Sequence, residues 1–132
     1  MKLNNIRITN YRCFKEADIA FDDHITLIVG KNGAGKTAIL DAVAVAVSTF
    51  LLGIDGGVSR GISKDDARYE FHDLNGTVDP QHQFPVSIDS VGGCLDNQAV
   101  KWVRSLNSEN GNTTVKEAVS YTHLTLPTIL LV

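Results

Sequence analysis

The sequence has few of the features that mark secreted or membrane-spanning proteins. Its two cysteines, Cys13 and Cys94, form no C-x-x-C pair and are too few for a disulfide framework. Reduced thiols in a cytosolic protein fit this usage. No apolar run approaches the ~20 residues of a membrane span, and Met1–Asn5 shows no apolar signal-peptide segment. We therefore expect a cytoplasmic protein that does not enter a membrane.

The sequence also lacks a strong excess of either charge. It has 12 basic and 15 acidic residues, a net charge of −3, which argues against a strongly cationic nucleic-acid surface. Local basic patches remain open, and the candidates are Arg60, Lys64 and Arg68, and Lys101 with Arg104. With 132 residues, 43% of them hydrophobic, the chain is sufficient for one soluble domain with one core.

Residues 30–37 read Gly-Lys-Asn-Gly-Ala-Gly-Lys-Thr and fit G-x-x-x-x-G-K-[ST], the pattern of a phosphate-binding loop, or P-loop. Gly30, Gly33 and Gly35 are expected to take positive φ and to bring the backbone close to a ligand. Successive N–H groups then form an anion-binding nest. Lys36 is the predicted catalytic residue, because its ammonium group reaches the β- and γ-phosphates, and the Thr37 hydroxyl is the predicted Mg²⁺ ligand.

The flanks of the loop agree with the motif. Ile25–Val29 is apolar and β-branched and predicts a strand buried on both faces. Lys36–Leu52 is apolar almost all round and contains no Gly or Pro, so it predicts a helix that ends at Gly53. The positive end of that helix adds to the attraction for phosphate.

The remaining segments predict mostly strands. Alternating apolar residues indicate strands over residues 1–9 and 17–21, and we expect them to form an antiparallel hairpin beside the P-loop strand. Further short strands are expected around 69–71, 86–88 and 99–104, with a tight turn at Asn75-Gly76. The predicted fold class is therefore α/β: a P-loop NTPase lobe with a mixed sheet and additional short antiparallel strands.

The C-terminal segment gives contradictory signals. Thr114–Glu117 fits a capping box and predicts the start of a helix. However, Val119–Val132 is uncharged, β-prone and interrupted by Pro127, which does not suit a helix. Because conflicting local signals are evidence against a consistent fold, we hypothesise that the lobe comprises residues 1–118. Residues 119–132, which resemble translated adapter sequence, would then be a non-native tail.

A family resemblance rests on the first third of the chain. Leu3-x-x-Ile6-x-Ile8-x-Asn10-Tyr11-Arg12-Cys13-Phe14, Phe21 and the run from Thr26 to Ala42 resemble the N-terminus of SMC, RecF, RecN and SbcC-type ATPases. These are ABC-type ATPase heads of DNA-repair and chromosome-maintenance proteins, and related AAA-type heads occur with anti-phage nucleases. The resemblance implies ATP and Mg²⁺ as cofactors. It also implies a larger parent protein that acts as a homodimer of heads or with a partner subunit such as a nuclease, with DNA as a further partner by analogy.

The resemblance also implies a set of site residues. In such heads the arginine of the Asn-Tyr-Arg turn lies near the nucleotide phosphates, which implicates Arg12, and guanidinium groups match phosphate oxygens well. The predicted ATP-binding set is Arg12, Cys13, Asn32, Gly33, Ala34, Gly35, Lys36, Thr37 and Ala38.

Two alternatives to an ATPase head remain open. The sequence has no apolar strand ending in Asp-Glu and no clear signature loop, since residues 90–94 have only a passing likeness to one. A non-catalytic nucleotide-binding or interaction module is therefore one alternative, and we expect no ATP turnover by this chain alone. The other is a GTPase-like switch, suggested by Asp89-x-x-Gly92, although no Asn-Lys-x-Asp guanine motif is present.

Overall fold

The computed structural model describes residues 2–93, 99–116 and 128–131. In chain order the elements are β1 (Lys2–Tyr11), β2 (Phe14–Ala20), β3 (Ile25–Ile28), α1 (Lys36–Ser48), the 3₁₀ turns η1 (Thr49–Gly53) and η2 (Lys64–Asp66), β4 (Tyr69–Leu74), β5 (Thr77–His82), β6 (Val86–Gly93), β7 (Ala99–Leu106), β8 (Thr114–Lys116) and β9 (Thr128–Leu131). The fold is mixed α/β, as predicted. No helix in the described ranges is long and apolar enough to cross a membrane.

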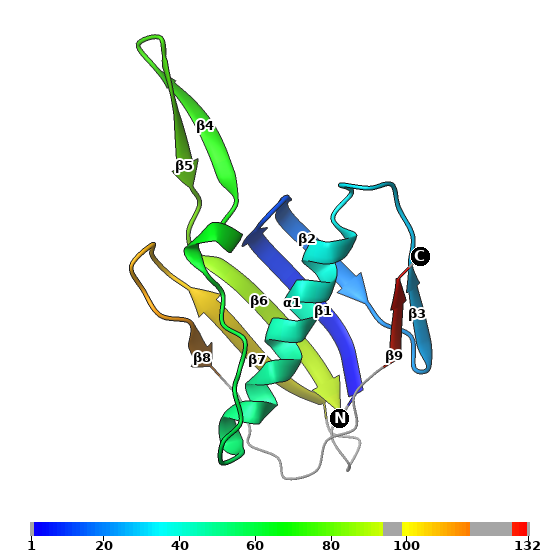
Figure 1. The fold of residues 1–132 in the computed structure, drawn as a ribbon. Helices are drawn as coiled ribbons and strands as arrows, with labels where there is room; N and C mark the ends of the chain where they lie inside the picture. Colours follow the sequence, from blue (N-terminus) through cyan, green and yellow to red (C-terminus); the bar gives the residue numbers. More distant parts are fainter. Residues whose placement is uncertain (1, 94–98, 117–127, 132) are drawn as a thin grey trace.

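A five-stranded antiparallel sheet forms the body of the molecule, with strand order β2-β1-β6-β7-β8 (Figure 1). The predicted hairpin of the first two strands is confirmed, with Ile6 opposite Ile19 and Ile8 opposite Ala17. A bulge after Leu3 shifts the register, so Leu3 and Ile6 are both buried although they are three residues apart. Strict alternation along the sequence therefore does not predict the whole buried face of β1.

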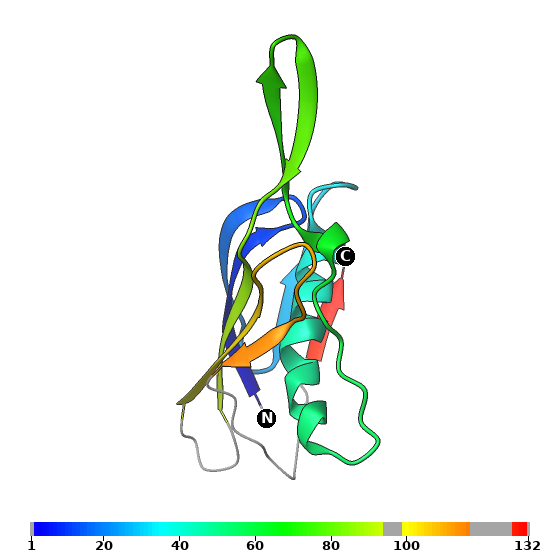
Figure 2. The ribbon, with the colours of Figure 1, turned by 90° about the vertical axis from the view of Figure 1, so that its left-hand side faces the viewer.

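Helix α1 packs on one face of this sheet, against β1, β6 and β7 (Figures 1 and 2). Trp102 of β7 lies at the centre of the contact and is 1% exposed. Its indole Nε1 donates to the Ala46 carbonyl at 3.0 Å, and its ring meets the Phe50 ring edge-on at 4.9 Å. Helical structure continues through η1 to Gly53, so the predicted end of the helix is confirmed, with its last turn wound as 3₁₀.

The P-loop strand β3 is not part of the large sheet. It pairs in parallel with β9, Ile25 opposite Thr128, and together they form a separate two-stranded sheet. The prediction that this strand is buried on both faces is wrong for the described residues: Ile25 and Leu27 are each 55% exposed, since no described layer covers those side chains. β9 falls within the hypothesised tail, whose residues 119–127 and 132 lie outside the described residues, so the status of the tail stays a prediction.

Two further predictions have opposite outcomes. Asn75 and Gly76 both have positive φ, 55° and 83°, and they close the β4–β5 hairpin, which extends beyond the sheet (Figure 1). The helix predicted to start at Thr114 is wrong, because Thr114–Lys116 is strand β8, paired with β7. The Thr114 hydroxyl bonds across the ladder to Ser105 at 2.8 Å, so it does not cap a helix. Glu117 lies outside the described residues.

Candidate nucleotide site

The P-loop joins β3 to α1, and two of its glycines have the expected backbone. Gly33 and Gly35 have φ of 83° and 100°, which only glycine adopts readily. The positive φ expected for Gly30 is wrong; its carbonyl instead accepts a 2.6 Å hydrogen bond from Lys36 Nζ. That bond closes the loop on itself and places the ammonium group over it.

The N-terminus of α1 favours an anion. Its N-cap residue is Gly35, which has no side chain to cap the helix, and the first turn carries no acidic residue. The positive end of the helix dipole would therefore attract a phosphate group.

A cavity of about 290 Å³ opens at this end of the helix. It is lined by Arg12, Cys13, Asn32, Gly33, Gly35, Lys36, Thr37 and Ala38. The structure thus gathers all the predicted site residues around one cavity except Ala34, which does not line it. Their contacts with nucleotide stay a prediction.

The P-loop packs tightly against the turn between β1 and β2. A Cβ atom added at Gly35 would lie 2.6 Å from Phe14 Cζ and 2.9 Å from Cys13 Sγ. The same atom at Gly33 would meet nothing within 4 Å. Gly35 therefore allows the loop to approach the turn that carries Arg12 and Cys13.

Gly35→Ala and Gly33→Ala form a matched pair, because both place a methyl group on a backbone with positive φ. We expect Gly35→Ala to lower the free energy of unfolding by about 1–2 kcal/mol more than Gly33→Ala, since only the former overpacks its surroundings. Urea denaturation followed by circular dichroism measures the difference. Equal losses in the two variants would contradict the close packing of loop and turn.

Arg12 reaches the cavity from that turn and is held by two carboxylates. Its Nη1 lies 2.5 Å from Asp41 Oδ2, on α1, and its Nε lies 3.0 Å from Asp66 Oδ1, on η2. Asp41 also pairs with Arg60 at 3.0 Å. Burial lowers the pKa of Arg12, but hydrogen bonds to Asp66 and Asp41 and the charge of Asp41 oppose it, and the pKa rises above its ordinary value. Arg12 therefore stays protonated at the cavity wall, beside its two carboxylate partners.

Sequence reasoning did not identify Asp41 and Asp66. Asp41 lies four residues after Thr37, and this spacing places the two on one face of a helix, which was an available signal. Asp66 follows a glycine-rich segment, and nothing local connects it with Arg12.

Tyr11, next to Arg12 in the chain, stays neutral at physiological pH. Burial raises its pKa to about 12, and the charge of Asp66 adds to the rise.

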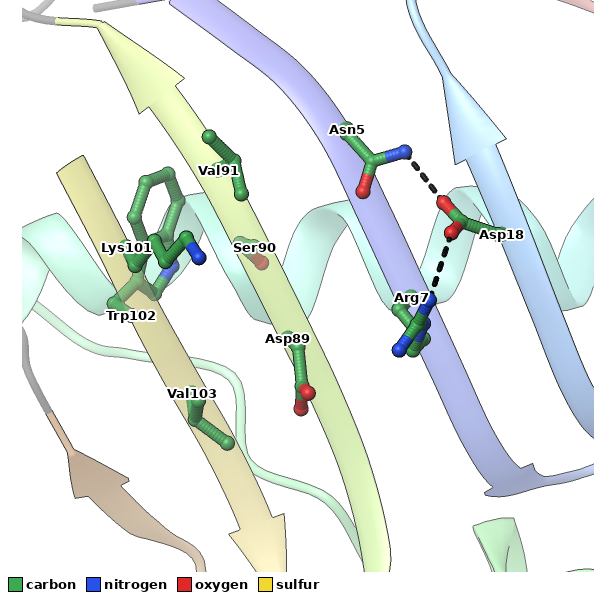
Figure 3. A pocket seen from close by; sticks show the side chains of 9 residues that line it. All are labelled: Asn5, Arg7, Asp18, Asp89, Ser90, Val91, Lys101, Trp102 and Val103. Atoms are coloured by element: carbon green, nitrogen blue, oxygen red, sulfur yellow. Dashed lines mark hydrogen bonds and ion pairs between the residues drawn. The ribbon is translucent and has the colours of Figure 1, made fainter. Parts of the chain in front are cut away.

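A second cavity, of about 370 Å³, lies on the sheet face turned away from α1 (Figure 3). Its charged side chains alternate in sign: Arg7 and Lys101 are accompanied by Asp18 and Asp89, and Arg7 pairs with Asp18 at 3.3 Å. Two carboxylates thus line this cavity itself, whereas the described lining of the cavity at the start of α1 contains Arg12 and Lys36 and no carboxylate. Although larger, it is not the better nucleotide site.

The residues that suggested a GTPase-like switch, Asp89-x-x-Gly92, and those with a likeness to a signature loop, 90–94, coincide with strand β6 as far as the structure describes them. Asp89 and Gly92 are in β6, which pairs with β1 on one side and with β7 on the other. Asp89 projects from the face turned away from α1 (Figure 3). Residues 90–93 belong to the same strand. In the described residues neither motif forms a loop beside the P-loop.

The basic residues considered as patches are mostly neutralised. Three are in ion pairs: Arg60 with Asp41, Lys64 with Glu109, and Arg68 with Glu70. Arg104 is 3% exposed, and burial lowers its pKa. Of the candidates for small basic patches, Arg60, Lys64 and Arg68 are therefore paired with carboxylates, Arg104 is buried, and Lys101 is exposed.

A strand, a glycine-rich loop with positive φ, and a helix whose first residues are Lys36 and Thr37 together define a P-loop NTPase lobe. The sequence profile of a family described as AAA domain matches residues 5–125. The chain belongs to this family, and it represents the N-terminal ATPase head of the SMC/RecF/Rad50 group.

Curated relatives agree with this assignment. The DNA replication and repair protein RecF of Oceanobacillus iheyensis is 42% identical over 45 residues, 34% of this chain and 12% of the relative. The DNA double-strand break repair Rad50 ATPase of Methanosarcina mazei is 48% identical over 42 residues, 32% of this chain and 4% of the relative. RecF of Actinobacillus pleuropneumoniae is 30% identical over 115 residues, 85% of this chain and 29% of the relative. The chain thus spans less than a third of each of these relatives.

Proposed function

We propose that this chain binds ATP with Mg²⁺ in the cavity at the start of α1. The observation that supports this most directly is the convergence there of Lys36, Thr37 and Arg12 on an uncapped helix N-terminus. Lys36 and Arg12 would neutralise phosphate charge, and the Thr37 hydroxyl would hold the metal ion. Bound Mg²⁺ would neutralise further phosphate charge.

The parent protein would use this nucleotide to drive conformational change, in DNA repair or maintenance or in phage defence. Support comes from the AAA domain match and from relatives named for DNA repair. Such a protein would act as a homodimer of heads or with a partner subunit such as a nuclease, and would engage DNA. A non-catalytic nucleotide-binding module is the second candidate, because the described residues that line the cavity include cations and a hydroxyl but no carboxylate or imidazole to act as a general base.

Calorimetric titration of ATP and GTP, each with and without Mg²⁺, tests the binding proposal. We expect ATP to bind, and Mg²⁺ to strengthen its binding. Thr37→Ala should remove most of the Mg²⁺ effect, because it deletes the metal-binding hydroxyl, whereas Thr37→Ser should preserve it. Tighter binding of GTP than of ATP would favour the alternative hypothesis of a GTPase-like switch. Steady ATP hydrolysis by the purified chain, lost in Lys36→Ala, would contradict the expectation of no turnover.

A further inference from the structure

The backbone around Arg12 is held by a segment more than fifty residues away in the chain. Arg12 has φ 51°, which is uncommon for a residue with a side chain. Its N–H donates to the Asp66 carbonyl at 2.6 Å, and Tyr11 forms a bridge with Ala67. Arg68 N donates to the Asn10 carbonyl at 3.0 Å. The segment from Asp66 to Arg68 therefore fixes the turn at the cavity wall.

The same segment also fixes the guanidinium group. Asp66 Oδ2 accepts from Ser63 N at 3.0 Å, which leaves Oδ1 directed at Arg12 Nε. The side chain of Asp66 is 15% exposed, so water competes weakly for this contact. The second carboxylate, Asp41, holds a different nitrogen of the guanidinium group, Nη1.

The arrangement leaves Arg12 able to bind a ligand. A guanidinium group has five N–H donors, and the two carboxylates take one each, on Nε and Nη1. Arg12 lines the cavity, so its remaining donors are available to phosphate oxygens. Asp41 lies on the same helix as Lys36 and Thr37, so α1 positions these two residues directly and helps to position Arg12 through the ion pair with Asp41.

We propose that Asp66 and Asp41 are positioning residues that hold Arg12 in the cavity. Through Arg12 they set the preference of the nucleotide site for a nucleoside triphosphate over a diphosphate. This inference rests on the proposed nucleotide-binding function. The P-loop backbone and the N-terminal end of α1 would supply donors to the inner phosphates, and Arg12, which approaches from a different element, would join Lys36 at the terminal phosphate. A guanidinium group already fixed at its site loses little conformational freedom when it binds the terminal phosphate.

A double-mutant cycle tests the proposal. The dissociation constants of Mg²⁺·ATP and Mg²⁺·ADP are measured by calorimetry for the unaltered chain and for Arg12→Ala, Asp66→Asn, Asp41→Asn and Arg12→Ala/Asp66→Asn. The side-chain amide introduced by Asp66→Asn has one oxygen and satisfies either Ser63 N or Arg12 Nε, but not both. We expect Arg12→Ala and Asp66→Asn each to reduce the ratio of ATP to ADP affinity by about tenfold, and the double variant to reduce it no further.

The matched control is Asp65→Asn, which changes the same net charge on the neighbouring exposed residue; its ratio should equal that of the unaltered chain. Thermal unfolding of each variant separates positioning from folding, and Asp41→Asn provides an independent test if Asp66→Asn unfolds. Unchanged ratios in both aspartate variants, or independent effects in the double variant, would overturn the inference while ADP binding persists. Failure of the unaltered chain to bind either nucleotide would instead overturn the proposed function, and the inference with it.

Discussion

Replacing Trp102 by alanine is expected to lower the free energy of unfolding by about 3–5 kcal/mol, the usual cost of emptying the place of a large buried aromatic side chain. Trp102 is 1% exposed and packs between the sheet and α1. The change removes the edge-on contact with Phe50 and leaves the Ala46 carbonyl without its indole donor. Close neighbours cannot fill the gap, because α1 is fixed by the rest of its contacts with the sheet.

Urea denaturation followed by circular dichroism measures this loss. Lys101→Ala is the matched control, since the neighbouring side chain on the same strand is exposed; its effect should stay within about 0.5 kcal/mol. Trp102→Phe keeps an aromatic ring but loses the hydrogen bond to Ala46, so it should fall between the two. A Trp102→Ala variant as stable as Lys101→Ala would mean that α1 does not dock on the sheet as described.

Lys36→Ala is expected to weaken nucleotide binding by roughly 1.5–3 kcal/mol, or about 10- to 150-fold, because a charge-assisted phosphate contact is lost. Lys36 lines the cavity, and its ammonium group stands over the loop. The free energy of unfolding should change much less than the binding energy, because the side chain is only partly buried.

Lys31→Ala is the control for Lys36, because it removes the same charge from the same loop at an exposed position that does not line the cavity. Calorimetric titration with Mg²⁺·ATP compares the two variants with the unaltered chain. Comparable affinities in all three proteins would contradict the assignment of the site. Comparable losses in both variants would show a general effect of charge, with no specific contact from Lys36.

Features encoded in contiguous residues could be predicted from the sequence. The P-loop, its flanking strand and helix, and the Asn75-Gly76 turn each depend on neighbours along the chain, and the structure has all of them. Asp66 could not be found in this way, because it meets Arg12 across 54 positions of sequence. The side chain of Arg12 and its two carboxylates come from three different elements, so their meeting is a property of the tertiary fold.

Two wrong predictions, a helix from Thr114 and a strand at Ile25–Val29 buried on both faces, also depend on contacts that are distant in the sequence. The capping-box pattern at Thr114 is short and local, and the cross-strand bonds to Ser105 on β7 take the hydroxyl that a helix cap would need. The composition of Ile25–Val29 correctly indicates a strand, but burial on both faces requires layers that a single segment does not specify. Local patterns therefore predict which element forms, whereas the surroundings determine what covers it.

The position of Trp102 also makes it an intrinsic fluorescence probe of the contact between α1 and the sheet. The sequence contains one tryptophan, and this indole donates to a carbonyl on the same helix that begins with Lys36 and Thr37. Its fluorescence therefore comes from a single buried site on the contact between α1 and the sheet. A shift of the helix alters the polarity around that indole, and unfolding exposes it to water. Emission spectra can thus follow both the arrival of a ligand and the loss of the fold without an attached dye.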